Sequence, residues 1–169
     1  MNKPVRILGI DTSLRSTGVG VVEAQGNKLS AVEYRTIKTS AKSRLSECLG
    51  LLNKELLDII KRHNPDAAAI EGAFFCKNVK TAMILGHARG TAIAACNSLD
   101  LPVYEYAPRK VKQAVVGFGT AGKTQVRKMV MTLLALDEEP EEDAGDALAI
   151  AVCHLHNRSA HEALAPKEI

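Results

Sequence analysis

The stretch VRILGIDTSLRSTGVGVVEAQGNKLSAVEYRTI (residues 5–37) decides the fold class of this chain. It begins with an apolar run at 5–11 that closes on an acid, and two further strand-like segments follow at 17–24 and 29–37. The tripeptide QGN at 25–27 suits a tight turn between the last two segments. Three strands in such close succession predict an antiparallel meander at one side of a sheet.

The rest of the chain alternates between helical and strand patterns. Apolar residues at helical spacing predict a helix over 43–63, which the Asn64-Pro65 pair ends. Further on, the patterns predict strands at 66–71 and 101–107 and helices at 77–97, 109–116, 123–136 and 143–156. A meander followed by alternating strands and helices predicts an α/β fold, in which helices cover both faces of a mixed sheet.

The length of 169 residues indicates one domain, which we place at 1–156, with 157–169 as a polar and flexible tail. Apolar residues make up 46% of the chain and charged residues 24%, as in ordinary soluble proteins. No apolar stretch approaches the roughly 20 residues that a membrane span needs, and no leader precedes the first strand. We therefore expect a cytoplasmic protein without a membrane partner.

The four cysteines are widely scattered and form no C-x-x-C pair. This spacing argues against a zinc site and indicates reduced thiols in the core of a cytoplasmic protein. The residues concerned are Cys48, Cys76, Cys96 and Cys153.

The charges of the chain are separated along the sequence, although the net charge is only +3. No acid occurs from Ala107 to Leu136, whereas seven of the ten residues from Asp137 to Asp146 are acidic. A basic face favours a polyanion and an acidic cluster favours a cation. Two solvated loops of opposite charge would explain the same pattern.

The segment GFGTAGKT (117–124) matches the phosphate-binding pattern of ATPases and GTPases. Such a loop joins a strand to a helix, and further strands must follow it to supply an acid for the metal. Here a short, strongly basic segment precedes the loop, and the residues after Lys123 have helical spacing as far as 136. We therefore expect no nucleotide. Glycines, a helix start and Lys123 suit a nucleic-acid phosphate equally well.

Four acids stand at positions where a fold can bring them together. Asp11 and Glu71 each end a predicted strand, and Asp143 and Asp146 are one turn apart at the start of a helix. Each could merely serve a turn, a sheet edge or a helix start. Two carboxylates at ~4 Å repel by about 4 kcal/mol at an effective dielectric near 20, so a converging set needs divalent cations. Oxygen ligands select Mg²⁺ or Mn²⁺, and two such ions support phosphodiester cleavage.

Several sequence blocks together resemble a known family. They are ILGIDTSLRSTGVGVV, IEGAFFCKN, LGHARGTAIAA, PVYEYAPRKVKQAVVGFGTAGKTQV and EEDAGDALAIAVCH. In this order they resemble the RuvC family of bacterial Holliday-junction resolvases over about residues 5–156. The resemblance implies a ribonuclease-H-like fold and a homodimeric, Mg²⁺-dependent endodeoxyribonuclease that nicks two strands of a four-way junction symmetrically in DNA recombination and repair. It also raises the RuvA–RuvB branch-migration complex as a partner.

The same resemblance assigns roles to individual residues. It makes Asp11, Glu71, Asp143 and Asp146 the metal-binding catalytic acids, and it places Lys112 and Lys123 near the cleaved strand. Phe74 corresponds to an aromatic residue that stacks on bases where the junction opens, although core packing would explain it as well. His154 and His156 are assigned to packing or to the surface.

The chain departs from the family pattern at two places. Thr12-Ser13 stands where Pro-Gly is usual, which leaves the geometry of that turn open. Gly72 stands where glutamine is commoner, which leaves open what supports Glu71 and which sequence is cleaved.

Small residues recur every four positions in the helix predicted at 77–97, at Ala82, Gly86, Gly90 and Ala94. Each glycine costs up to ~1 kcal/mol in a helix interior, so this spacing indicates close approach of another backbone. That backbone belongs either to a second copy of the chain or to the chain's own sheet. A two-fold dimer would place two acid clusters on one symmetric substrate.

Three other functions remain open from the sequence. The same nuclease chemistry could act on RNA–DNA hybrids or on another branched DNA. GIDTSLRSTGVGVV also resembles the phosphate loop of actin-like and sugar-kinase ATPases, but 169 residues do not provide their second lobe. A non-catalytic junction-binding scaffold would not need all four acids.

Overall fold

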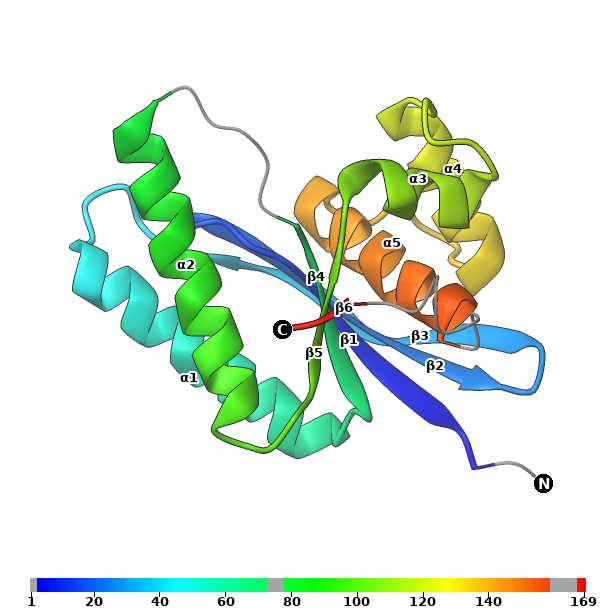
Figure 1. The fold of residues 1–169 in the computed structure, drawn as a ribbon, viewed down its shortest axis with the longest axis horizontal. Helices are drawn as coiled ribbons and strands as arrows, with labels where there is room; N and C mark the ends of the chain where they lie inside the picture. Colours follow the sequence, from blue (N-terminus) through cyan, green and yellow to red (C-terminus); the bar gives the residue numbers. More distant parts are fainter. Residues whose placement is uncertain (1–2, 73–77, 159–166) are drawn as a thin grey trace.

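The computed structural model describes residues 3–72, 78–158 and 167–169, which form one mixed sheet with helices on both faces (Figure 1). The strand order is β3-β2-β1-β4-β5-β6. The strands are β1 Val5–Asp11, β2 Ser16–Gln25, β3 Lys28–Lys38, β4 Ala67–Glu71, β5 Val103–Tyr106 and β6 Lys167–Glu168. The helices are α1 Leu45–His63, α2 Val79–Asn97, α3 Pro108–Val116, α4 Lys123–Leu134 and α5 Glu142–Asn157.

The predicted meander is confirmed. Strands β1, β2 and β3 pair in antiparallel fashion, and Gly26 takes a positive φ of 60° in the turn between β2 and β3. Strand β4 then pairs in parallel with β1 on one side and with β5 on the other. Parallel pairing requires a crossover connection, and the helices between these strands supply it.

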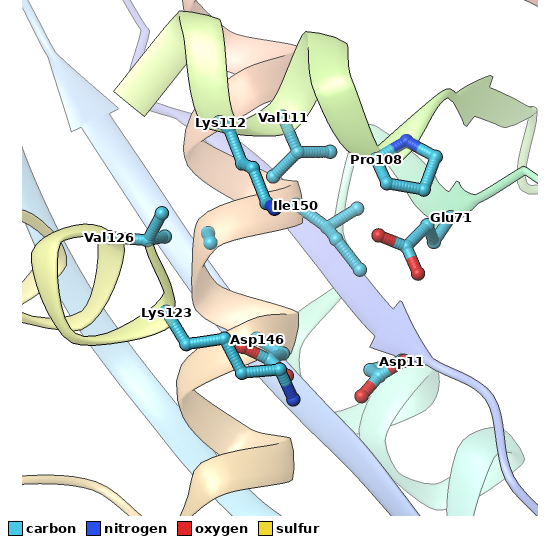
Figure 2. A pocket seen from close by; sticks show the side chains of 10 residues that line it. Asp11, Glu71, Pro108, Val111, Lys112, Lys123, Val126, Asp146 and Ile150 are labelled. Atoms are coloured by element: carbon cyan, nitrogen blue, oxygen red, sulfur yellow. The ribbon is translucent and has the colours of Figure 1, made fainter. Parts of the chain in front are cut away.

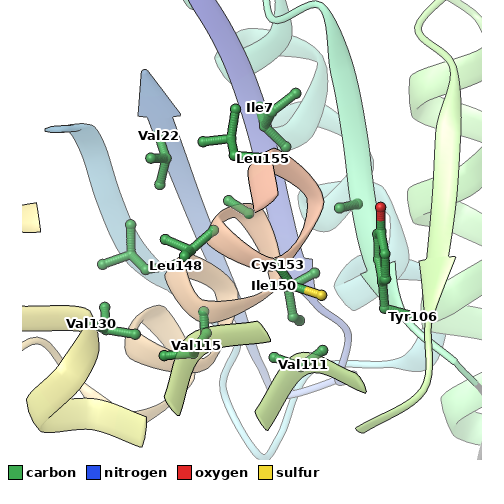
Figure 3. Packing of buried hydrophobic residues seen from close by; sticks show 14 of the residues in the cluster. Ile7, Val22, Tyr106, Val111, Val115, Val130, Leu148, Ile150, Cys153 and Leu155 are labelled. Carbon is green, nitrogen blue, oxygen red and sulfur yellow. The ribbon is translucent and has the colours of Figure 1, made fainter. Parts of the chain in front are cut away.

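The two faces of the sheet have separate cores. Because successive strand residues point to opposite faces, Leu8 of β1 packs in the core under α1 and α2, whereas Ile7 packs in the core under α5. Figure 3 shows the second core, in which Leu148 and Ile150 of α5 lie between the sheet and the helices α3 and α4. Helix α5 is therefore buried on nearly all sides between Ala144 and Leu155, whereas Asp146 is half-buried.

Glycines in β1 and β2 let α5 lie directly on the sheet. A Cβ on Gly9 would come within 1.9 Å of the carbonyl oxygen of Ala147, and one on Gly18 within 1.8 Å of that of Asp143. Any other residue at these two positions would push the helix away. The glycines thus set the distance between the sheet and the N-terminal half of α5, which carries Asp143 and Asp146.

The end of the chain is held by the sheet. Lys167 pairs with Glu105 and Glu168 with Tyr104 in the antiparallel β5–β6 ladder, and Ile169 donates its backbone N–H to Val103 at 3.0 Å. Residues 167–169 of the predicted tail are therefore paired with the sheet, and residues 159–166 lie outside the described part of the chain. An edge strand leaves backbone groups unpaired, and pairing with the chain end satisfies those of β5.

The small-residue face of α2 does not pack on the sheet. Ala82, Gly86, Gly90 and Ala94 are exposed, and a Cβ on either glycine would meet none of the described residues within 4 Å. Three other alanines of the helix face the core instead, namely Ala88, Ala92 and Ala95. The chain's own sheet is therefore not the backbone that this face approaches.

Three cysteines are free and buried, as predicted: Cys48, Cys96 and Cys153. Burial raises the pKa of Cys96 and of Cys153 to about 12, so these thiols stay protonated and inert. Cys76 lies outside the described residues. In the described part of the chain, no helix is long and apolar enough to cross a membrane.

His154 makes the stability of the fold depend on pH. Its ring is buried, its Nδ1 lies 2.9 Å from the hydroxyl oxygen of Tyr106, and burial together with Arg158 lowers its pKa to about 4. The unfolded chain therefore binds this proton more readily between pH ~6.5 and pH 4. We expect the free energy of unfolding to fall by up to about 3 kcal/mol across that window as the pH drops. Urea unfolding of the wild type and of His154→Gln at pH 7.5 and pH 4.5 measures this, and an equal pH dependence of both would contradict it.

Candidate active site

Five elements meet around one cavity of about 370 Å³. Figure 2 shows Asp11 at the end of β1, Glu71 at the end of β4 and Asp146 on α5 around this space. Lys112 of α3 and Lys123 of α4 also line it. Its apolar wall consists of Pro108, Val111, Val126, Ala149 and Ile150. Six of the seven candidate site residues lie in the described chain, and five of these six line the cavity.

The pairing of β1 with β4 explains why the first two acids meet. These strands are parallel neighbours with Ile10 opposite Ile70, so the next residues, Asp11 and Glu71, emerge at the same edge of the sheet. Helix α5 crosses this part of the sheet and brings Asp146 to the same place. The prediction that acids from distant parts of the sequence converge at one edge is confirmed for these three.

Asp143 is held slightly apart from the other acids. The hydroxyl of Ser16, the first residue of β2, donates a hydrogen bond to the Asp143 carboxylate. Asp143 does not line the cavity, although its negative charge still raises the pKa of Asp11. The sequence offered no sign of the contact with Ser16, because it joins residues 127 positions apart.

The cavity has an excess of negative charge. Burial, together with the charges of Asp146, Glu71 and Asp143, raises the pKa of Asp11 to about 7, against the opposing effect of Lys123. Burial and Asp146 also raise the pKa of Glu71, against the opposing effect of Lys112 and Lys123. The charged form of these carboxyls is therefore disfavoured in the protein alone, and a bound cation would stabilise it.

The donor set fits a hard divalent cation, since Mg²⁺ and Mn²⁺ prefer carboxylate oxygens. Among residues 3–72, 78–158 and 167–169, no three Asp, Glu, His or Cys side chains lie close enough together to enclose a metal ion. The acids share one cavity without forming a closed cage.

The glycine-rich segment 117–124 connects helix α3 to helix α4. It thus lacks the strand that precedes a nucleotide-binding loop, in agreement with the prediction. Lys123 is the first residue of α4, and its Nζ lies 2.7 Å from Glu142 and 3.9 Å from Asp146. Its ammonium group therefore stands at the mouth of the acidic cavity.

The sequence singles out two positions close to Glu71, Phe74 and Gly72. Phe74 lies outside the described residues. Gly72 is buried next to Glu105, and the contact that holds the backbone there comes from Arg89 of α2. Sequence reasoning missed Arg89, although it is the only Asp, Glu, Lys or Arg between residues 81 and 97, and this isolation was the available signal.

Comparison with known proteins identifies the family. A family model described as crossover junction endodeoxyribonuclease RuvC matches residues 7–154. This chain belongs to the RuvC family. A RuvC from Pelotomaculum thermopropionicum is 49% identical over 152 residues, which cover 89% of this chain and 93% of the relative. A RuvC from Magnetococcus marinus is 43% identical over 166 residues, covering 98% of this chain and 92% of the relative.

The fold agrees with that of solved RuvC structures. The structure of Thermus thermophilus RuvC in complex with a Holliday junction substrate superposes with a TM-score of 0.90 at 32% identity. It covers 98% of this chain and 99% of the Thermus chain. The ribonuclease-H-like fold implied by the resemblance is therefore confirmed. The RuvC family consists of divalent-metal-dependent nucleases, which fits the carboxylates around the cavity.

Proposed function

We propose that this RuvC-family endodeoxyribonuclease resolves four-way DNA junctions by two symmetric nicks and acts in DNA recombination and repair. The observation that carries the proposal is the cavity in which Asp11, Glu71 and Asp146 face Lys112 and Lys123. The likeness to the Thermus RuvC solved with a Holliday junction substrate, over 98% of this chain, supports the choice of substrate.

Asp11, Glu71, Asp143 and Asp146 are the residues that would hold the metal, with Mg²⁺ as the natural ion, Mn²⁺ as a substitute and two ions in each site. A divalent cation bound there supplies positive charge that activates water and stabilises the leaving oxygen of a phosphodiester. Lys112 and Lys123 bind the phosphodiester itself and offset its repulsion from the acids. The apolar wall, with Val111 and Ile150, restricts the water around the reacting phosphate.

The protein acts as a homodimer through α2, and Phe74 stacks on bases at the opened junction. The exposed small-residue face of α2 supports the dimer, because it can admit a second backbone closely: no described residue of this chain lies within 4 Å of a Cβ added at Gly86 or Gly90. Sedimentation equilibrium should show dimers of the wild type and monomers of Gly86→Leu. A dimeric Gly86→Leu would rule out this interface. The RuvA–RuvB complex is a further partner that a pull-down with four-way junction DNA can test.

A nicking assay on synthetic DNA tests the proposal. We expect paired, symmetric nicks in a four-way junction with Mg²⁺ and none with EDTA. A linear duplex and an RNA–DNA hybrid of matched sequence serve as controls. Equal rates on all three substrates would contradict the junction assignment, and faster cutting of the hybrid would favour the alternative substrate.

Removal of one lysine from the cavity should slow the reaction. Lys112 is half-buried beside the acids, so we expect Lys112→Ala to reduce the nicking rate by about 10-fold, or roughly 1.4 kcal/mol of transition-state stabilisation. Lys128→Ala is the matched control, because Lys128 is exposed on α4 and does not line the cavity. Single-turnover rates of the two variants at saturating junction should differ. Equal rates would show that Lys112 does not contribute to the reaction.

A further inference from the structure

Arg89 of α2 joins three elements next to Glu71. Its guanidinium donates a hydrogen bond of 2.6 Å to the backbone oxygen of Glu71 and pairs with the carboxylate of Glu105 on β5. The Arg89 side chain is only 18% exposed and that of Glu105 only 30%. One planar side chain therefore bridges the end of β4 and the neighbouring strand, and it does so from a helix on the opposite face of the sheet from α5.

Arg89 contacts the backbone at the residue where β4 ends. Glu71 is the last residue of β4, and the N–H of Gly72 still bonds the carbonyl oxygen of Tyr106 at 2.7 Å. A Cβ on Gly72 would lie 3.4 Å from the side chain of Glu105, so the Arg89–Glu105 pair packs against this glycine. Gly72 has no side chain that could support the end of β4. The Arg89–Glu105 pair supports it from the neighbouring elements.

Arg89 acts on the position of Glu71 and not on its charge state. The hydrogen bond goes to the backbone oxygen, whereas the Glu71 carboxylate points into the cavity toward Asp11 (Figure 2). Fixing the backbone oxygen fixes the peptide plane, and with it the direction in which the side chain leaves the strand. A guanidinium suits this task because its rigid fork can serve two acceptors at once, which an ammonium group does not reproduce.

We propose that Arg89, aimed by Glu105, is a positioning residue that holds the Glu71 carboxylate in place for the divalent cation. This inference rests on the proposed role of Glu71 as a metal-binding acid. Groups that orient metal ligands typically change metal affinity by 10- to 100-fold when they are replaced. Arg89 also neighbours Gly90 of the exposed small-residue face, so the helix proposed to form the dimer is the one that braces the metal site.

Metal affinity tests the proposal apart from nicking activity. Calorimetric titration of the full chain with MgCl₂ should give a Kd at least about 10-fold weaker for Arg89→Lys than for the wild type. Glu105→Gln keeps an acceptor for Arg89 but removes the charge that aims it, and a smaller loss of roughly threefold is expected. This second variant decides the question if Arg89→Lys does not fold.

Arg62→Lys is the matched control. Arg62 of α1 also pairs with two acids, Glu33 at 2.5 Å and Asp58 at 2.7 Å, but it contacts none of the candidate metal ligands. Its replacement should lower the thermal stability of the metal-free protein and leave the Kd for Mg²⁺ within about twofold of the wild type. A similar Kd for wild type, Arg89→Lys and Glu105→Gln would overturn the inference. If Arg62→Lys weakened Mg²⁺ binding equally, the effect of Arg89→Lys would be explained by a general loss of stability. A wild type that binds no Mg²⁺, by contrast, would contradict the proposed function itself.

Discussion

Asp11→Asn is expected to lower the nicking rate by at least about 1,000-fold while it stabilises the metal-free protein. Both effects have the same cause. Asp11 is buried next to Asp146, Glu71 and Asp143, and its pKa is raised to about 7. The negative charge at this position is needed to hold a cation, but it is unfavourable when no cation is present. An amide of the same shape removes the repulsion together with the metal ligand.

The pH dependence of this stabilisation follows from the direction of the pKa shift. The folded protein holds the Asp11 proton up to about pH 7, whereas the unfolded chain releases it near the ordinary aspartate pKa of 3.8. The Asp11 contribution to stability is therefore present below pH 4 and is lost as the pH rises through 7. In EDTA, we expect Asp11→Asn to exceed the wild type in free energy of unfolding by on the order of 2–4 kcal/mol at pH 8, and by much less at pH 4.

Urea unfolding and junction nicking together check this prediction. Asp137→Asn is the control, because Asp137 is an exposed acid that does not line the cavity, and we expect it to change neither quantity. Saturating Mg²⁺ should narrow the stability gap between wild type and Asp11→Asn, because it stabilises only the protein that binds it. Normal nicking by Asp11→Asn with Mg²⁺ would show that Asp11 does not hold a metal. Lower stability than wild type in EDTA at pH 8 would contradict the unfavourable charge at Asp11.

The sequence was sufficient where local patterns decide the structure. The apolar run before Asp11 and the one before Glu71 each predicted a strand, and two parallel neighbours must present their ends at the same edge. The helical spacing after Lys123 was also enough to separate the glycine-rich segment from a nucleotide-binding loop. In each case the period of the apolar residues contains the required information.

Contacts between distant segments escaped sequence reasoning. The bond from Ser16 to Asp143 and the bond from Arg89 to the Glu71 backbone depend on the exact distances between packed elements. The pairing of Lys167 with Glu105 joins backbone groups at the edge of the sheet, and the order of side chains in the sequence does not indicate it. The sequence likewise does not show which face of α2 is turned to the sheet, whereas the structure exposes the face that carries Gly86. Residues that support the acids are therefore harder to predict than the acids themselves.

Gly18→Ala should disturb the active site from a position that carries no functional group. A Cβ on Gly18 would lie 1.8 Å from the carbonyl oxygen of Asp143 and 2.2 Å from its carbonyl carbon, so the first turn of α5 has to move by more than an ordinary side-chain adjustment. Overpacking against backbone of this kind costs about 3 kcal/mol or more. The movement also displaces Asp143 and Asp146, and a shift of about 1 Å in such groups can reduce the rate by roughly 100-fold.

Gly50→Ala separates this contact from the general effect of replacing glycine. Gly50 is exposed in α1, and a Cβ there would meet no described residue within 4 Å, so alanine is expected to stabilise the protein by up to ~1 kcal/mol. Opposite signs of the two changes in urea unfolding, together with slow nicking by Gly18→Ala alone, are the expected result. If Gly18→Ala matched the wild type in both stability and nicking, α5 could not lie on β2 as closely as the glycines indicate. The placement of Asp143 and Asp146 beside the other acids would then lose its structural basis.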